Sequence, residues 1–249
     1  MKLAGLVEYD GTDFSGWAAQ PGQRTVEGSL SEALGTILRQ PVKLSVAGRT
    51  DAGVHASGQV VSFEAETELS PAEVSYKTTA VLPPDVALRR CAPVSHDFDA
   101  RKSARSRSYE YRVLDGAIRS PLLRRYTSRV PKSLDTGLLD EAAGLVRGTH
   151  DFRAFTPSRS YHSYFVRKVT ESLWERRGEV LVYRITADAF LYGMVRTLVG
   201  TMREVAEGRR SLGDFASLLG GADERSRAGP SAPPQGLTLV RAAYEEQIV

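Results

Sequence analysis

The apolar positions of the first hundred residues switch between the spacing of strands and the spacing of a helix. Residues 2–9 and the run QVVSFE at 59–64 are rich in β-forming side chains, which predicts two strands. The alternating run VKLSVA at 42–47 predicts another strand just before the second of these. Between the first strand and this run, Thr25 is a candidate N-cap of a helix near 25–39. The apolar residues of that helix share one face: Val26, Leu30, Leu34, Ile37 and Leu38.

Capping residues predict a second helix. Ser70 is a candidate N-cap, Pro71 suits the first turn and Glu73 completes a capping box, so we expect a helix that ends before Pro83. A strand near 86–92 follows. The resulting order is β-α-β-β-α-β, which is the ferredoxin-like pattern.

The second half of the chain repeats this order in its predicted elements. It begins with the alternating strand SRSYEYRVL at 106–114. A helix near 135–147 should bury Leu138, Ala142, Leu145 and Val146. A long hairpin over 163–187 turns at residues 176–179. The remaining expected elements are a helix at 190–206, a short helix at 212–219, a Gly/Pro/Ser-rich loop at 225–236 and a final strand LTLVRAAY.

The 190–206 helix carries its apolar residues on one side: Leu191, Val195, Leu198, Val199, Met202 and Val205. We therefore predict an α+β protein with two ferredoxin-like units, whose mixed or antiparallel sheets flank a basic active-site cleft. The expected domains are residues 1–99 and 100–249, with the boundary falling near residues 95–105.

Composition adds few constraints to this picture. Hydrophobic residues make up 41% of the 249 residues and charged residues 25%, as in ordinary globular proteins. No apolar run has the roughly 18 residues needed to span a bilayer, and the opening residues do not resemble a signal peptide, so we expect a cytoplasmic protein. The single cysteine, Cys91, excludes an intramolecular disulfide and is expected to be a buried small hydrophobe.

Positive charge is concentrated in one stretch of the chain. Residues 100–130 hold nine Arg or Lys, eight of them Arg, against two acidic residues, although the net charge is only +3. Arginine suits bidentate phosphate contacts, and the interleaved Tyr109, Tyr111 and Tyr126 offer surfaces on which bases could stack. The stretch favours RNA as a partner, with a solvated basic face as the alternative interpretation.

The candidate for catalysis is the loop GRTDAGVH at residues 48–55, between two predicted strands. It brings Arg49, Asp51 and His55 together on a loop, which is where catalytic residues are often displayed. The alternative is a tight turn in which the Asp51 side chain bonds backbone amides and Gly53 supplies a positive φ. His55 has no nearby metal-ligating partner, so we interpret it as a structural, hydrogen-bonded residue without a catalytic role.

The sequence carries no other recognisable catalytic signature: no P-loop, dinucleotide fingerprint, HExxH, CxxC or nucleophile elbow. Asp97 and Asp99 alternate on an extended segment and are interpreted as caps or a polar edge. Residues 148–152 could bind a metal only together with distant ligands. We therefore expect no metal site.

The segment GRTDAGVHASGQVVSF resembles the core motif of the TruA family of tRNA pseudouridine synthases. Five further segments resemble motifs of that family in the correct order: YDGTDFSGW, FDAR with RSYEYRV, GTHDFRAF, FLYGMVRTLVG and AGPSAPPQGLTL. Together they span nearly the whole chain. The chain departs from the family pattern at Ala18, where Gln is common, and at Gly193, where a larger polar residue is common.

The resemblance implies a role for four residues at matching positions. Asp51 aligns with the nucleophile, Arg49 with its companion arginine, and Tyr109 with the tyrosine that lies against the target base. Arg196 matches an arginine that lines the cleft and contacts the aspartate. An adjacent guanidinium would lower the pKa of the Asp51 carboxyl, a role expected of Arg49 or Arg196.

The activity implied is the isomerisation of uridine to pseudouridine at positions 38–40 of the tRNA anticodon stem-loop, by a homodimer without a cofactor. The target base would have to leave its stack to reach a cleft. The Arg-rich run 101–129 would hold tRNA phosphates, with Arg101, Arg105 and Arg107 as expected contacts and Tyr109 against the base.

Two other classes of function stay open at this point. A non-catalytic RNA-binding protein of two ferredoxin-like units would normally carry RNP-type aromatic motifs, and the sequence has none. A glycosidase or nucleosidase would need a second positioned carboxylate, and no convincing partner for Asp51 is evident in the sequence.

Overall fold

The structure is a computed structural model that describes residues 1–158, 163–221, 225–245 and 248. Its backbone contacts divide the chain into two compact units. Unit 1 consists of Met1–Arg107 together with Thr238–Val249, and unit 2 of Ser108–Leu237. The expected domains were residues 1–99 and 100–249, whereas in this division residues 100–107 and the C-terminal strand belong to unit 1.

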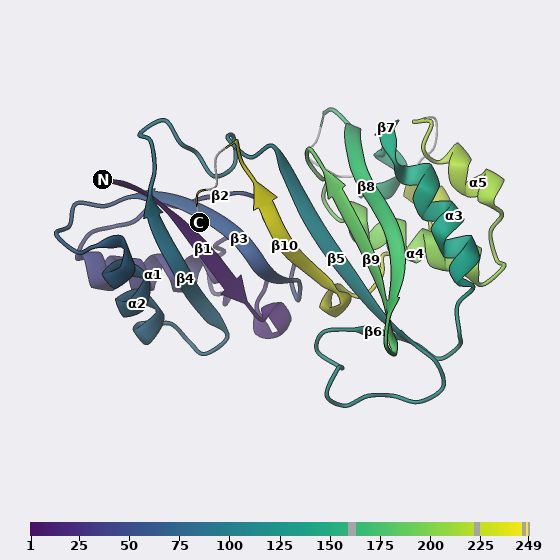
Figure 1. Cartoon of the computed structure of the whole chain (residues 1–249), viewed down its shortest axis with the longest axis horizontal. Helices are drawn as coiled ribbons and strands as arrows, with labels where there is room; N and C mark the ends of the chain where they lie inside the picture. Colours follow the sequence, from purple (N-terminus) through teal and green to yellow (C-terminus); the bar gives the residue numbers. More distant parts are fainter. Residues whose placement is uncertain (159–162, 222–224, 246–247, 249) are drawn as a thin grey trace. The chain divides into compact units, whose positions relative to one another are not determined.

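Unit 1 contains the predicted β-α-β-β-α-β order (Figure 1). Its elements are β1 (Lys2–Tyr9), α1 (Val26–Leu38), β2 (Ser45–Val46), β3 (His55–Glu64), α2 (Pro71–Val81), β4 (Val86–Pro93) and, from the end of the chain, β10 (Leu237–Ala243). A short 3₁₀ turn, η1, spans Gly11–Asp13. The strands are ordered β4-β1-β3-β10. β1 is antiparallel to both β3 and β4, whereas β10 is parallel to β3.

The helix caps of unit 1 confirm the sequence interpretation. The Thr25 side chain accepts a hydrogen bond from the Gly28 amide at the start of α1. At the start of α2, Ser70 and Glu73 form the reciprocal capping box, with Pro71 in the first turn. These local bonds satisfy amides that have no partner within the helix, so the start of each helix is specified by nearby residues.

The strand predicted at 42–47 is reduced to the two residues of β2. β2 pairs with Ser62 and Val61 of β3, while β10 pairs with His55 and Ala56 on the same strand. β2 and β10 thus pair with separate lengths of β3. An alternating sequence pattern predicts a strand but does not fix how many of its residues pair with a neighbour.

The lone cysteine, Cys91 of β4, is buried as predicted. Burial raises the pKa of its thiol to about 12, so the sulfur is protonated at physiological pH. A small apolar cluster of unit 1 includes the buried residues Phe98 and Ala100, and Tyr244 packs against it. The Tyr244 hydroxyl donates to the carbonyl of Ala100 at 2.8 Å, which ties the C-terminal segment to this cluster.

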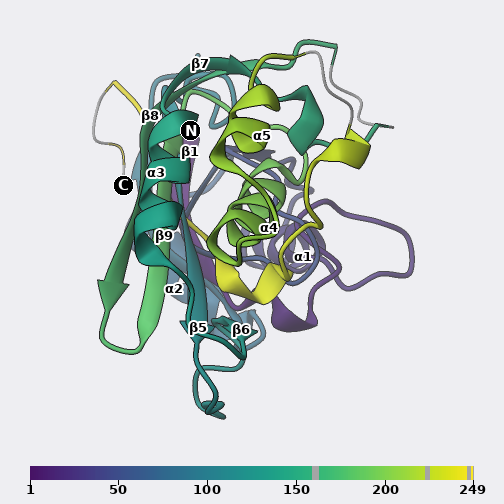
Figure 2. The ribbon, with the colours of Figure 1, turned by 90° about the vertical axis from the view of Figure 1, so that its right-hand side faces the viewer.

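Unit 2 combines a β-sheet with helices that pack against it. Its elements are β5 (Ser106–Asp115), β6 (Ser128–Val130), α3 (Thr136–Val146), β7 (Gly148–Asp151), β8 (Val166–Arg177), β9 (Val180–Ala187), α4 (Met194–Ala206) and α5 (Leu212–Ser217). The strand order is β5-β9-β8-β7, and β6 pairs in parallel with the end of β5. Figure 2 looks onto α3, α4 and α5; α3 packs against β8 and against the two other helices.

The α+β class is confirmed, and most predicted elements of unit 2 are found. The hairpin turns at residues 178–179, between Arg177 and Val180, as expected. The closing strand of the second repeat, however, is β10, which pairs with β3 in unit 1. Helix α4 begins at Met194 instead of residue 190, because Gly193 adopts a left-handed conformation with φ of 68° immediately before it. The remaining 3₁₀ turns are η2 (Arg153–Phe155), η3 (Arg225–Arg227) and η4 (Pro234–Gly236).

The buried face of α3 differs from the prediction. Leu145 is exposed, and the buried residues of the helix are Leu139, Ala142, Ala143 and Val146. Contacts from β8 explain this rotation, because Ser172 donates to the Ala143 carbonyl and the Trp174 amide donates to the Asp140 carboxylate. The part of the chain that the structure describes contains no helix long and apolar enough to cross a membrane.

An acid-sensitive contact in unit 2 joins the end of β5 to β8. The buried Asp115 carboxylate accepts from both terminal nitrogens of Arg176 at 3.0 Å and from the Leu134 amide at 3.1 Å. Burial by itself would raise the pKa of Asp115, but these donors hold the pKa below its ordinary value. A carboxylate with a depressed folded-state pKa stabilises the fold above its unfolded-state pKa, and this contribution disappears as the pH falls through the folded-state value.

Asp115→Asn should therefore lower the free energy of unfolding at pH 7 by roughly 1.5–3 kcal/mol, as expected for lost hydrogen bonds to a charged group. The difference from wild type should shrink steadily below about pH 4, near the ordinary pKa of aspartate. Thermal unfolding of both proteins between pH 3 and pH 7 measures this. An equal gap at both ends of that range would contradict the assignment.

Candidate active site

Arg49 and Asp51 lie on the loop between β2 and β3 in unit 1. The side chain of Asp51 is half-buried, that of Thr50 is buried, and that of Arg49 is exposed. Arg49 forms no ion pair with any residue in the described part of unit 1. The loop therefore carries one half-buried carboxylate and, two residues before it, one exposed cationic side chain.

The opening segment YDGTDFSGW packs against this loop and holds its backbone. The Trp17 amide donates to the Thr50 carbonyl at 3.0 Å, and the Gly53 amide donates to the Phe14 carbonyl at 3.3 Å. A Cβ atom at Gly11 would lie 2.0 Å from the Val54 carbonyl oxygen, and one at Gly16 would lie 2.9 Å from that of Thr50. Only glycine allows such close approach, so two motifs that are far apart in the sequence form one scaffold around Asp51.

The turn interpretation of the loop also has support. The Val54 amide donates to the Asp51 carbonyl at 3.2 Å, and Gly53 has a φ of 76°. Asp51 thus contributes its main-chain carbonyl to a tight turn. A turn and a reactive carboxylate are compatible here, because the two use different atoms of the same residue.

His55 is buried at the start of β3 and serves the scaffold. Its Nδ1 accepts a hydrogen bond from the Gly11 amide at 3.0 Å and lies 3.2 Å from the Asp10 carboxylate. This is the hydrogen-bonded structural histidine that the sequence suggested. Within the described residues, no group of three or more His, Cys, Asp or Glu side chains is arranged to hold a metal ion.

A buried polar network beneath the loop was not predicted from the sequence. The Tyr9 hydroxyl lies 2.8 Å from Thr50 Oγ1, and Gln59 Nε2 donates both to that hydroxyl at 3.3 Å and to the Gly48 carbonyl at 2.6 Å. Gln59 opens the run QVVSFE, where a polar residue at an inward position of a strand was the available signal.

Tyr109 and Arg196 belong to unit 2. Tyr109 lies on β5 and is buried, with its ring edge-on to Phe190 at a centroid distance of 4.9 Å. Arg196 lies in the first turn of α4, where its Nε donates to the Ala232 carbonyl at 2.7 Å. The Ala232 amide in turn donates to the Arg196 carbonyl at 2.9 Å. Ala232 therefore fixes both the main chain and the guanidinium of Arg196.

The loop that carries Ala232 is attached to α4 along its length. The Gly229 amide donates to Thr201 Oγ1 at 3.0 Å, and the Ser231 hydroxyl lies 3.0 Å from that of Thr197. Gly200 lies so close to the loop that a Cβ atom there would be 1.7 Å from the Pro230 carbonyl oxygen. An isolated glycine within a predicted helix was the sequence signal for this close approach.

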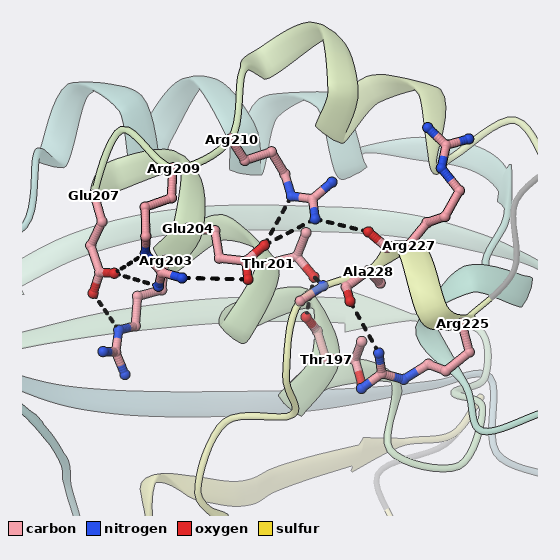
Figure 3. Close-up of polar contacts among 11 residues, drawn as sticks. Thr197, Thr201, Arg203, Glu204, Glu207, Arg209, Arg210, Arg225, Arg227 and Ala228 are labelled. Carbon is pink, nitrogen blue, oxygen red and sulfur yellow. Dashed lines mark hydrogen bonds and ion pairs between the residues drawn. The ribbon is translucent and has the colours of Figure 1, made fainter.

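Arginines at the end of α4, in the segment that follows it and in η3 form contacts around the start of the same loop (Figure 3). Arg210 donates to the Arg227 carbonyl at 2.8 Å and to Glu204 at 3.0 Å, and Arg225 donates to the Ala228 carbonyl at 3.3 Å. Arg203 and Arg209 share the carboxylate of Glu207. These contacts use guanidinium groups as structural braces within unit 2.

The three arginines predicted to bind phosphates differ in their surroundings. Arg101 is exposed, and Arg105 is exposed and ion-paired with Glu245. The Arg107 guanidinium donates to the carbonyls of Ala47, Ala104 and Arg101 at 2.7–3.2 Å. Asp99, which precedes this stretch, accepts from the amides of residues 101 and 102, in agreement with its interpretation as a cap.

The two departures from the family pattern are also located. Gly193 caps α4 in the left-handed conformation, which larger residues rarely adopt, so glycine suits this position. Ala18 is half-buried and directly follows Trp17 of the scaffold. Nothing in the structure explains why alanine stands there.

Comparison with known proteins identifies the family. The model of a family described as tRNA pseudouridine synthase matches residues 6–101 and 142–245. A "tRNA pseudouridine synthase A" of Geobacillus kaustophilus is 40% identical over 247 residues, covering 99% of this chain and 95% of the relative.

Relatives of the same name occur in Xanthomonas campestris pv. campestris, at 40% identity, and in Xanthomonas euvesicatoria pv. vesicatoria, at 41%; each covers 98% of this chain and 95% of the relative. A crystal structure of a Cbf5-Nop10-Gar1 complex aligns with a TM-score of 0.38 at 15% identity, over 96% of this chain and 59% of that one. That likeness is too weak to bear on fold or function. The full-length relatives and the family match lead to one conclusion: the chain belongs to the tRNA pseudouridine synthase family.

Proposed function

We propose that this protein isomerises uridine to pseudouridine at positions 38–40 of the tRNA anticodon stem-loop, with Asp51 as the nucleophile. The observation that carries the proposal is the loop around Asp51, where a half-buried carboxylate stands on a backbone held by bonds to Phe14 and Trp17. Membership of the family, with relatives named tRNA pseudouridine synthase A, supports the same reaction.

The reaction breaks the N1–C1′ bond of the uridine, turns the detached uracil and forms a C5–C1′ bond. C5 loses its proton and N1 gains one, so the isomerisation balances without an oxidant, a reductant or a donated group. A carboxylate can hold the sugar or the base covalently, or remove a proton from the sugar, while the uracil turns. Each route requires Asp51 in its ionised form.

We assign Tyr109 to the uracil. Phe190 packs edge-on against its ring and restricts the orientations that the ring can take, which suits a fixed contact with the base. Its hydroxyl is a candidate for hydrogen bonding to the uracil and for assisting the removal of the C5 proton. A rigid aromatic group costs less ordering free energy on binding than a flexible side chain does.

Arg49 and Arg196 are proposed as the cations that favour the ionised carboxylate of Asp51. Arg196 is the better preorganised of the two, because Ala232 fixes its Nε, whereas Arg49 is exposed and without an ion pair within the described part of unit 1. We propose that Arg196 serves Asp51 directly and that Arg49 responds to the bound RNA.

The Arg-rich stretch is proposed to hold the tRNA backbone. Exposed Arg101 and Arg105 are suited to contact phosphates, whereas Arg107 is engaged with three carbonyls and would contribute by fixing the segment 101–107. A uridine within the anticodon arm must leave its stack to reach a carboxylate, so we expect base flipping. Flipping is least costly for bases that are weakly paired.

We further propose that the protein is a cytoplasmic homodimer, as the family resemblance implies. In such a dimer, one subunit would hold part of the tRNA whose uridine enters the site of the other. Sedimentation at several protein concentrations tests the oligomer. A monomer mass that does not change with concentration would contradict it.

Tritium release from tRNA labelled at C5 of uridine tests the proposed reaction, without added metal or nucleotide. We expect release from unmodified tRNA and none from a tRNA with cytidine at positions 38, 39 and 40. Free uracil would indicate a nucleosidase instead. Tight binding without tritium release would indicate a non-catalytic RNA-binding protein.

A further inference from the structure

Two residues beneath the Asp51 loop have no place in the chemistry described so far. Tyr9 and Gln59 lie on neighbouring strands of unit 1, β1 and β3, and their relative exposures are 3% and 0%. Burying a hydroxyl and an amide is costly unless both are hydrogen-bonded. Their hydrogen bonds go to the loop that carries Arg49 and Asp51.

Every donor of the Gln59 amide group is accounted for. One Nε2 hydrogen goes to the Gly48 carbonyl at 2.6 Å and the other to the Tyr9 hydroxyl at 3.3 Å, while Oε1 accepts from the Val60 amide at 3.2 Å. This set of partners defines the orientation of the amide, since the NH₂ group must face both acceptors. The Tyr9 hydroxyl, which accepts from Gln59, also shares a hydrogen bond with Thr50 Oγ1 at 2.8 Å, in which either hydroxyl can donate.

The chain of bonds therefore holds the loop on both sides of Arg49. It reaches Gly48 before that residue and Thr50 after it, and Thr50 directly precedes Asp51. Burial raises the pKa of Tyr9 to about 12, even though its bonds to Thr50 and Gln59 act in the opposite direction. Tyr9 thus keeps its proton over the working pH range and is suited to a fixed hydrogen bond, not to proton transfer.

We propose that Tyr9 and Gln59 are positioning residues for the reaction: through Gly48 and Thr50 they set the direction in which Asp51 and Arg49 meet the substrate. This inference rests on the proposed function. Small errors in the placement of a nucleophile reduce rates strongly, by up to about a hundredfold per ångström, whereas binding of the large tRNA depends on many other contacts. Loss of the network should therefore lower kcat and leave KM unchanged.

The chain offers a matched control for this test. Tyr183 is as buried as Tyr9, and its hydroxyl also bonds a single hydroxyl at 2.8 Å, that of Ser172 in the core of unit 2. Tyr9→Phe and Tyr183→Phe thus make the same chemical change in equally dry surroundings. Tyr9→Phe should lower kcat for tritium release roughly tenfold with KM within twofold of wild type, and Tyr183→Phe should leave both constants within twofold.

Two further readouts separate positioning from a general loss of stability. The pH profile of kcat should keep its shape in Tyr9→Phe, because no titrating catalyst is removed. Thr50→Val, which removes the partner hydroxyl, should lower kcat similarly, and the double variant should lose no more than either single one. Equal kinetics for Tyr9→Phe and Tyr183→Phe, or additive losses in the double variant, would overturn the inference.

Hydrogen exchange tests the network independently of catalysis. Amides in the loop 48–54 should exchange faster in Tyr9→Phe than in wild type, and Tyr183→Phe should not change them. If the wild-type protein released no tritium, the proposed function would fail while this measurement could still support the network. If the wild type were active but the loop exchanged equally in both variants, the positioning role alone would be rejected.

Discussion

Asp51→Asn should lower the rate of pseudouridine formation by a factor on the order of 10³ or more, as removal of a nucleophile does in enzymes. Asparagine has nearly the same shape as aspartate but carries no charge and is a poor nucleophile. The backbone bonds that hold the loop use main-chain atoms of Thr50, Asp51 and Gly53, so they survive this substitution. The variant should therefore fold and bind tRNA as the wild type does.

Single-turnover tritium release, with tRNA binding measured in parallel, provides the comparison for Asp51→Asn. Asp97→Asn is the matched control, because Asp97 is an exposed aspartate of unit 1 outside the loop. We expect the control to retain wild-type rates. Residual activity above about a tenth of wild type in Asp51→Asn would remove Asp51 from its assigned role.

Gly200→Ala should disrupt both stability and activity. Alanine normally favours a helix interior by about 1 kcal/mol over glycine, but the added methyl group at this position would lie 1.7 Å from the Pro230 carbonyl oxygen. The loop must move, and overpacking of this kind typically costs about 1–3 kcal/mol. Displacing the loop also displaces Ala232, which fixes Arg196, so we expect turnover to fall roughly ten- to a hundredfold.

A second helical glycine provides the control for Gly200. Gly144 lies within α3, and a Cβ atom there would meet no heavy atom within 4 Å. Gly144→Ala should therefore raise the free energy of unfolding by about 0.5–1 kcal/mol and leave turnover unchanged. Thermal unfolding and tritium release on both variants test the pair. If the two substitutions shifted stability in the same direction, the close approach of the loop to α4 would be in doubt.

Local signals in the sequence predicted the elements well. Thr25 and the Ser70–Glu73 capping box specify helix starts through bonds to residues three positions away, which a single sequence reveals directly. Features that depend on distant partners were not predictable in the same way. β2 has only two residues because it pairs with β3 only at Val61 and Ser62, and the buried face of α3 follows from the contacts of β8 with Asp140 and Ala143. A buried face with Leu138 and Leu145 and one with Leu139 both fit helical spacing, so the neighbouring elements determine which face of α3 is buried.

The candidate site was predictable to the extent that its motifs are contiguous. From the spacing alone, Asp51 could be either a turn residue or a nucleophile. The resemblance of six ordered segments to the family favoured the nucleophile. The roles of Tyr109, Arg196 and the phosphate-binding arginines stay predictions. The supporting residues could not be assigned from the sequence, because Tyr9 and Gln59 are 50 positions apart and meet only when β1 pairs with β3.

The return of β10 to unit 1 bears on how the protein folds during its synthesis. The strand that pairs with His55 and Ala56 is made only after all of unit 2, so the nascent unit 1 emerges with that length of the β3 edge uncovered. Domains usually fold in the order in which they leave the ribosome. Here the length of β3 next to the Asp51 loop would gain its β10 partner only when residues 237–243 have been translated.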